Sequence, residues 1–93
     1  MDKYLDSTLA EPMDAVVLLN DRYAAKGLRC GDVGTVMENR IADLGFVICD
    51  FADPVSGASL SPVAEIGKDD FRVLSDSPAD RRIFRAFCAR FSR

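Results

Sequence analysis

Short apolar runs separated by polar turns recur along most of the chain, at the spacing typical of β-strands. In the run at 46–51, the two-residue period places Val47, Cys49 and Phe51 on one face. The run at 14–20 contains five consecutive apolar residues, which favours a strand covered on both faces. The pattern predicts five strands, at 14–20, 31–39, 46–51, 60–66 and 71–74.

The segments between these runs are rich in turn-forming residues. We expect residues 42–45 and 52–59 to connect neighbouring strands, and residues 21–27 to form a longer excursion with a helical turn. Pro62 has no N–H to donate, so it belongs at a sheet edge or near the start of its strand. Residues 1–13 show no clear period and form either a loose arm or a strap across the domain.

The last segment carries the start signals of a helix. Ser77 is a plausible N-cap, Pro78 follows at the first helical position, and Asp80 lies three residues after the cap. Beyond them, apolar residues one, three and four apart form one stripe: Ile83, Phe84, Phe87, Cys88 and Phe91. Three phenylalanines exceed what a small barrel easily covers, so the helix packs on its own barrel, on a second copy or on another partner.

Five short strands followed by one helix favour a mainly β fold, a small five-stranded antiparallel barrel with a C-terminal amphipathic helix. We divide the chain into an N-terminal arm at 1–13, the barrel at 14–76 and the helix at 77–93. A length of 93 residues suits one domain with one core. No apolar run reaches the roughly 20 residues that cross a bilayer, and the N-terminal segment has acids where a signal peptide needs bases. We therefore expect a cytoplasmic protein.

The net charge of −3 is unevenly distributed along the chain. Residues 1–76 hold 14 acids and 7 bases, a balance of −7, whereas residues 77–93 hold one acid and five arginines, a balance of +4. The isoelectric point is about 4.8. Because a nucleic-acid-binding domain normally carries a basic excess, this balance favours a protein partner over nucleic acid.

The composition contains few of the side chains that catalysis uses. The chain has no histidine, which removes the commonest general base and metal ligand. Its three cysteines, Cys30, Cys49 and Cys88, are far apart and form no Cys-x-x-Cys pair, so neither a disulfide framework nor a zinc site is expected. We predict a non-enzymatic protein without metal or cofactor.

The glycine-rich stretch LRCGDVGTVMEN, at 28–39, raises the question of a ligand-binding loop. A phosphate-binding loop requires further glycines and a helix directly after it, whereas here a strand follows. The structural interpretation is stronger: Gly27 and Gly31 supply turn conformations, Asp32 binds the amides of the turn, and Gly34 lets a neighbouring strand come close.

Three segments, DAVVLLNDRYAAKGLRCGDVGTVMEN, FVICDF and DDFRVL, together resemble the domain-of-unknown-function family 4926. That family has a strand, a GL-x-x-GDVGTVVE segment, a V-E-F strand and a final L-x-x-L strand. The resemblance covers residues 14–74 and is most specific between Gly27 and Glu38. It implies an SH3-like barrel, akin to the KOW-type barrels of ribosome- and transcription-associated proteins, with no catalytic residues to carry over. It also implies a role as an antitoxin or immunity partner of a neighbouring protein.

The candidate binding residues are charged. We expect the acidic body to bind another protein, and the arginines of the C-terminal helix to pair with the body or contact a partner. A homodimer through this helix and a KOW-like barrel bound to nucleic acid or ribosomes are the alternatives; an enzyme whose site is shared with another subunit is the weakest. No membrane partner is expected. The candidate partner-binding residues are Asp50, Asp53, Glu65, Asp69, Asp70, Arg81, Arg82 and Arg85.

Overall fold

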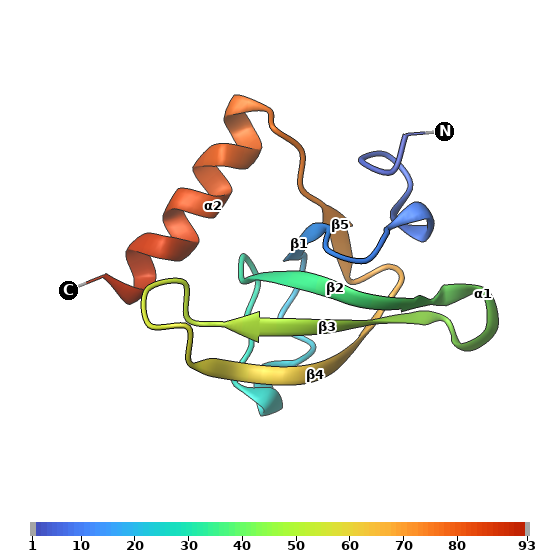
Figure 1. Cartoon of the computed structure of the whole chain (residues 1–93), viewed down its shortest axis with the longest axis horizontal. Helices are drawn as coiled ribbons and strands as arrows, with labels where there is room; N and C mark the ends of the chain where they lie inside the picture. The colour runs from blue at the N-terminus through green and yellow to red at the C-terminus, as the bar shows by residue number, and fades with distance from the viewer. Residues whose placement is uncertain (1, 93) are drawn as a thin grey trace.

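The computed structural model describes residues 2–92 and contains one sheet, two α-helices and two short 3₁₀ helices (Figure 1). The chain order is η1 (Ser7–Leu9), β1 (Ala15–Leu18), η2 (Ala24–Lys26), β2 (Val33–Arg40), α1 (Ile41–Leu44), β3 (Phe46–Ala52), β4 (Ser59–Gly67), β5 (Phe71–Val73) and α2 (Pro78–Phe91). All five strands and the C-terminal helix therefore form where the sequence pattern predicts them. The turn expected at 42–45 is largely the single helical turn α1.

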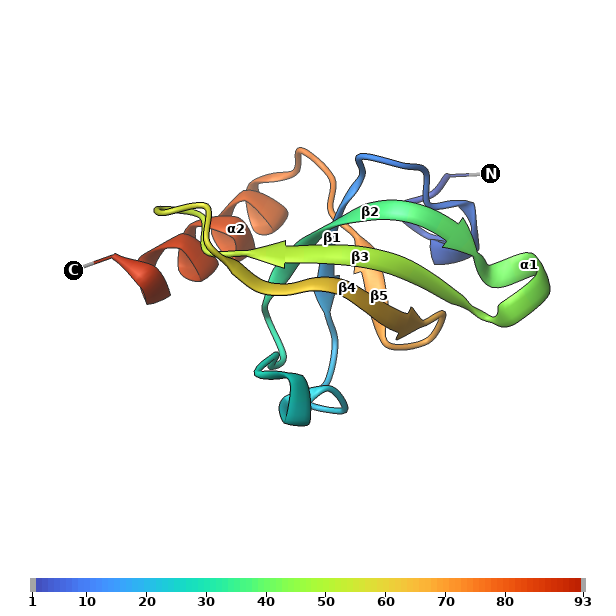
Figure 2. The same cartoon turned by 60° about the horizontal axis from the view of Figure 1, so that its bottom comes forward.

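The five strands form one antiparallel sheet in the order β4-β3-β2-β1-β5. The sheet is strongly twisted and curls over its concave face (Figure 2). The mainly β, five-stranded antiparallel fold with a C-terminal helix is confirmed. The sheet is barrel-like without being closed, because β4 and β5 are its two edges and do not pair in the part of the chain that the structure describes.

The core fills the concave side of the sheet. Each strand contributes alternate side chains to it, as the two-residue period requires. The strand β3 shows this most clearly, because Val47, Cys49 and Phe51 are fully buried and the residues between them are half-buried. The buried cluster consists of Ala10, Val16, Leu18, Leu28, Val36, Val47, Cys49, Phe51, Ala64, Ile66, Phe71 and Val73.

The pairing of β3 with its two neighbours shifts at three points, of which two affect the acidic part of the sheet. Between Val36 and Glu38 the pairing of β2 with β3 shifts by one residue, so Met37 is extra. On the other side of β3, the residues 62–63 of β4 both lie opposite Asp50. Pro62 therefore lies in a bulge of an edge strand, the kind of position expected for it.

The N-terminal residues form a strap rather than a loose arm. We call residues 2–14 the N-terminal strap. The Asn39 side chain donates to the carbonyl oxygens of Thr8 and Ala10, at 3.1 and 2.8 Å. The Met13 N–H donates to the Val36 carbonyl at 2.8 Å. Ala10 is buried in the main core, so both polar and apolar contacts attach the strap to the sheet.

The helix α2 packs on the convex face of its own sheet. Val33, Val17 and Arg72 lie opposite one another across β2, β1 and β5. Asp80, near the N-terminus of α2, pairs with Arg72, and Arg90, near the C-terminus, pairs with Asp32 beside Val33. The helix thus lies across this row of residues and is held at both ends.

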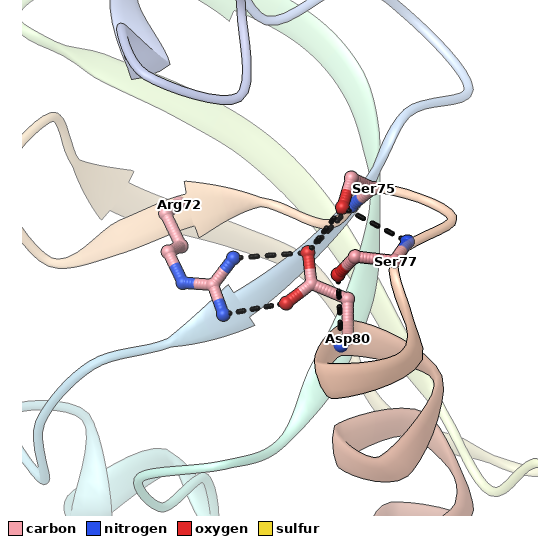
Figure 3. Close-up of polar contacts among 4 residues, drawn as sticks. All are labelled: Arg72, Ser75, Ser77 and Asp80. Carbon is pink, nitrogen blue, oxygen red and sulfur yellow. Dashed lines mark hydrogen bonds and ion pairs between the residues drawn. The ribbon is translucent and has the colours of Figure 1, made fainter.

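The N-terminus of α2 is fixed by a compact polar cluster (Figure 3). The Ser77 hydroxyl accepts from the Asp80 N–H at 3.2 Å, which is the N-cap bond. The Asp80 carboxylate accepts from Arg72 at 3.1 and 2.8 Å, and from the Ser75 N–H and hydroxyl at 2.7 and 2.9 Å. The Arg72 guanidinium and the Ser75 donors hold the pKa of Asp80 well below its ordinary range.

Candidate functional site

The convex face of β2, β3 and β4 bears a cluster of carboxylates. The register places Glu38, Ile48 and Glu65 directly opposite one another on the three strands. Asp50 lies two residues beyond Ile48, hence on the same face of β3. We call this surface the acidic sheet face. It consists of Met37, Glu38, Ile48, Asp50, Val63 and Glu65.

The carboxylates of the acidic sheet face have little compensating positive charge. Cross-strand neighbours place their Cβ atoms about 5 Å apart, so Glu38 and Glu65 both flank Ile48 closely. Glu38 contacts Arg40 at 3.6 Å, an exposed pair of small energetic value. Asp50 and Glu65 form no ion pair with any residue from 2 to 92. Glu38 and Glu65 are two strand spacings apart, about 10 Å, with Ile48 between them, so their mutual repulsion is weak at physiological salt.

Exposed apolar side chains accompany these acids. Met37 is 55% exposed and Val63 is 65% exposed, and both lie at the bulges. Ile48 is half-buried between the two glutamates. Methionine and branched aliphatic side chains among uncompensated charges form a surface suited to a protein partner, because the apolar groups give affinity and the charges select the partner.

Sequence reasoning identified Asp50 and Glu65 as candidate residues but missed Glu38. In a regular strand, Val36 and Glu38 would share a face, and Glu38 would then point into the core. The extra residue Met37 moves Glu38 to the convex face. Regular alternation would bury Glu38, and glutamate is almost never buried without a partner. This conflict is the signal in the sequence that could have indicated a bulge.

The other predicted acids lie outside this face. Asp53 belongs to the β3–β4 loop, where its carboxylate accepts from the N–H groups of Val55 and Ser56 at 2.8 and 3.2 Å. Asp69 is exposed in the turn between β4 and β5. The structure therefore brings Asp50 and Glu65 together and separates Asp53 and Asp69 from them.

Asp70 is a structural residue in a buried polar network and does not join the acidic sheet face. It is 6% exposed and accepts from the Tyr23 hydroxyl at 2.7 Å and the Asn20 amide at 2.9 Å. Arg22 approaches it at 3.5 Å, and the Tyr23 hydroxyl in turn accepts from the Gly67 N–H at 2.8 Å. Burial opposes ionisation of Asp70, but these hydrogen bonds outweigh it and lower its pKa.

In the glycine-rich corner, at 27–34, the glycines serve the turn and the packing of the sheet, as the structural interpretation predicts. Gly27 and Gly31 have φ values of 78° and 90°, which favour glycine. A Cβ on Gly34 would lie 2.7 Å from the ring of Phe51, so the side chain of the neighbouring strand occupies that space. The carboxylate of Asp32 accepts from the Arg29 N–H at 3.0 Å and from Arg90 of α2.

Three of the predicted arginines lie together on α2. Arg81, Arg82 and Arg85 are exposed, and none of them forms an ion pair within the described range 2–92. We expected the helix arginines either to pair with the acidic body or to contact a partner. The pairing with the body is made by Arg90, through Asp32, and Arg90 was not among the candidate residues. Arg81, Arg82 and Arg85 thus remain an uncompensated basic surface.

The cysteines form no site. Cys30 is exposed, Cys49 is fully buried in the core and Cys88 is half-buried on α2. Burial raises the pKa of the Cys49 thiol to about 12, so this residue behaves as a small apolar side chain. Among residues 2–92, no three acid or cysteine side chains are grouped so that they could hold a metal ion. No helix within the same range is long and apolar enough to cross a membrane.

A comparison of this chain with protein-family models, curated proteins and solved structures finds no match.

Proposed function

We propose that this chain is a non-enzymatic protein-binding module that uses the acidic sheet face to bind a partner with a basic, partly apolar surface. The observation that supports this is the grouping of Glu38, Asp50 and Glu65 around Ile48, with Met37 and Val63 exposed beside them. Asp50 and Glu65 have no ion pair among residues 2–92 and Glu38 has only the exposed Arg40, so a basic partner would supply the missing positive charge.

The family resemblance adds a class of partner to this proposal. A barrel of the antitoxin or immunity kind binds a neighbouring protein and blocks its active surface. A partner that acts on nucleic acid has a basic substrate groove, and the acidic sheet face would compete with the substrate by charge complementarity.

The test uses a photo-crosslinking residue at Val63 of the full chain, expressed in the native cell at physiological salt. We expect one crosslinked protein of fixed mass, which purified components then bind. Glu38→Lys/Glu65→Lys should weaken that binding at least about tenfold, because each reversal replaces an attraction by a repulsion. Asp69→Lys is the matched control, since it reverses an exposed acid outside the face and should leave binding unchanged.

Two results would contradict the proposal. Equal binding by the wild type and by Glu38→Lys/Glu65→Lys would show that the acidic sheet face is not the interface. Recovery of RNA or DNA instead of a protein would favour the KOW-like alternative. Its binding should fall steeply as salt rises and should not depend on the position of the crosslinker.

A further inference from the structure

A groove of about 520 Å³ separates α2 from the N-terminal strap. The two segments stand on either side of the linker that joins β5 to α2 (Figure 1). The groove lies away from the acidic sheet face, on the part of the convex surface that α2 partly covers. Its lining includes Tyr4 from the strap, Ala15 from β1, Leu74 and Asp76 from the linker, and Arg81, Phe84 and Arg85 from the helix.

One wall of the groove is basic. Arg81 and Arg85 are one helical turn apart, so both guanidinium groups lie along the same side of α2. Arg82 is adjacent and exposed. As shown above, these three arginines have no ion pair within the described chain, whereas Arg72 and Arg90 are paired with buried aspartates.

The strap side of the groove is lined by Tyr4, and the strap on which Tyr4 lies is rich in acids. The N-terminal strap holds Asp2, Lys3, Asp6, Glu11 and Asp14. Lys3 pairs with Asp14 at 2.8 Å, which leaves three acids of the strap without an ion pair to residues 2–92. The hydrogen bonds from the sheet hold the strap in place, so these carboxylates are presented without further ordering.

This arrangement is self-complementary under a twofold axis. When two grooves face each other, the acidic strap of each chain meets the basic wall of the other, and both contacts are equivalent. We propose that a second copy of this chain occupies the groove, in a twofold dimer that pairs the strap carboxylates with Arg81, Arg82 and Arg85.

Exposed apolar side chains supply the centre of such an interface. Leu5 is 89% exposed, Phe84 is 47% exposed and Tyr4 is 41% exposed. Tyr4 and Phe84 both line the groove, and Leu5 follows Tyr4 on the strap. An interface core of aromatic and aliphatic residues with a charged rim is the usual anatomy of a specific protein contact.

The charges also disfavour the other occupants of this groove. A symmetric contact of α2 on α2 places arginines against arginines, which is repulsive. A nucleic acid would gain from Arg81 and Arg85 but would be repelled by the carboxylates of Asp76 and Asp80, which line the same groove. A second copy brings its acidic strap to the helix arginines and its own arginines to the strap, so both contacts are attractive.

The test measures the mass of the full chain in solution by sedimentation equilibrium at low and high salt. We expect twice the 10.2 kDa of one chain at low salt, with weaker association at high salt because exposed charges are screened. Arg81→Glu/Arg85→Glu should raise the dimer dissociation constant roughly 100-fold, and Asp2→Lys/Asp6→Lys should do the same. The control Lys26→Glu reverses an exposed lysine of η2, outside the groove lining and the strap, and should leave the constant unchanged.

The decisive arm is the charge exchange. A 1:1 mixture of Arg81→Glu/Arg85→Glu with Asp2→Lys/Asp6→Lys should restore a heterodimer, since each strap then meets an oppositely charged helix. A wild-type chain that stays monomeric at high concentration would overturn the proposal. So would a dimer that ignores both reversals, or single variants that dissociate but do not recover when mixed. Circular dichroism is the check that each variant remains folded, and none of the expected results depends on the acidic sheet face.

Discussion

Replacing Asp80 by alanine should loosen the attachment of α2 to the sheet. The carboxylate accepts four hydrogen bonds, two from Arg72 and two from Ser75. Its side chain is only 7% exposed, but that of Arg72 is 38% exposed and regains water when released. The ion pair therefore contributes about 0.5 to 1 kcal/mol, in the range of partly exposed pairs. The stranded Ser75 donors cost about 1 to 2 kcal/mol, and the lost acid in the first helical turn adds about 0.5 kcal/mol.

The expected loss in the free energy of unfolding is about 2 to 3.5 kcal/mol in total, a large part of the roughly 5 to 15 kcal/mol that stabilises a typical domain. Urea denaturation followed by far-ultraviolet circular dichroism measures it. Asp76→Ala is the matched control, because Asp76 is an exposed neighbour with no ion pair among the described residues, and it should change stability by less than about 0.5 kcal/mol. Hydrogen exchange should also speed up along α2 in Asp80→Ala.

The pH dependence gives the same reasoning a second test. The folded state lowers the pKa of Asp80, so its stabilisation is complete above the ordinary value near about 4 and is lost as the pH falls below it. Between about pH 5 and pH 2, the wild type should lose more stability than Asp80→Ala. Two results would refute the assigned role of this cluster. One is a difference in the free energy of unfolding below about 0.5 kcal/mol at neutral pH, and the other is an equal loss of stability by the two proteins on acidification.

Three further outcomes follow from the same contacts. Gly34→Ala should destabilise the protein by about 2 kcal/mol through the clash with the Phe51 ring, and Phe51→Leu should recover part of that loss in a double-mutant cycle of urea midpoints. Tyr23→Phe removes the donor to Asp70 and strands a backbone N–H, so calorimetry should show a loss of about 1 to 3 kcal/mol. A maleimide should label Cys30 rapidly in the native protein and Cys49 only after unfolding; native labelling of Cys49 would contradict its burial.

The strands and the helix were predictable because each buries one face, and the buried positions recur at a regular spacing of apolar residues in the sequence. The two-residue period of β3 and the Ser77-Pro78 start of α2 are local signals that survive in the folded protein. The open edge between β4 and β5 was not predictable, since barrel closure depends on strand curvature and on long-range pairing.

The candidate site was only partly predictable, because carboxylates look alike in a sequence. Asp50 and Asp70 have the same chemistry, yet one lies on an open face and the other in a buried network whose partner Tyr23 is 47 residues away. The position of Glu38 depends on one extra residue in β2, and alternation alone cannot show such a bulge. Asp70 is distinguished by its distant partner Tyr23, and Glu38 by the bulge, and neither feature shows in the local sequence.

The ion pair between Asp32 and Arg90 has a consequence for synthesis of the chain. Val73 completes the sheet, and Arg90 follows 17 positions later. At a translation speed of roughly 5 to 20 residues per second, this interval lasts about one to three seconds. During that time every strand has been made, while the carboxylate that is 1% exposed in the finished protein still lacks its cation. Until the helix docks, the Asp32 carboxylate has the Arg29 N–H but not the Arg90 guanidinium, so the ion pair at the GDVG corner can form only after every strand has been made.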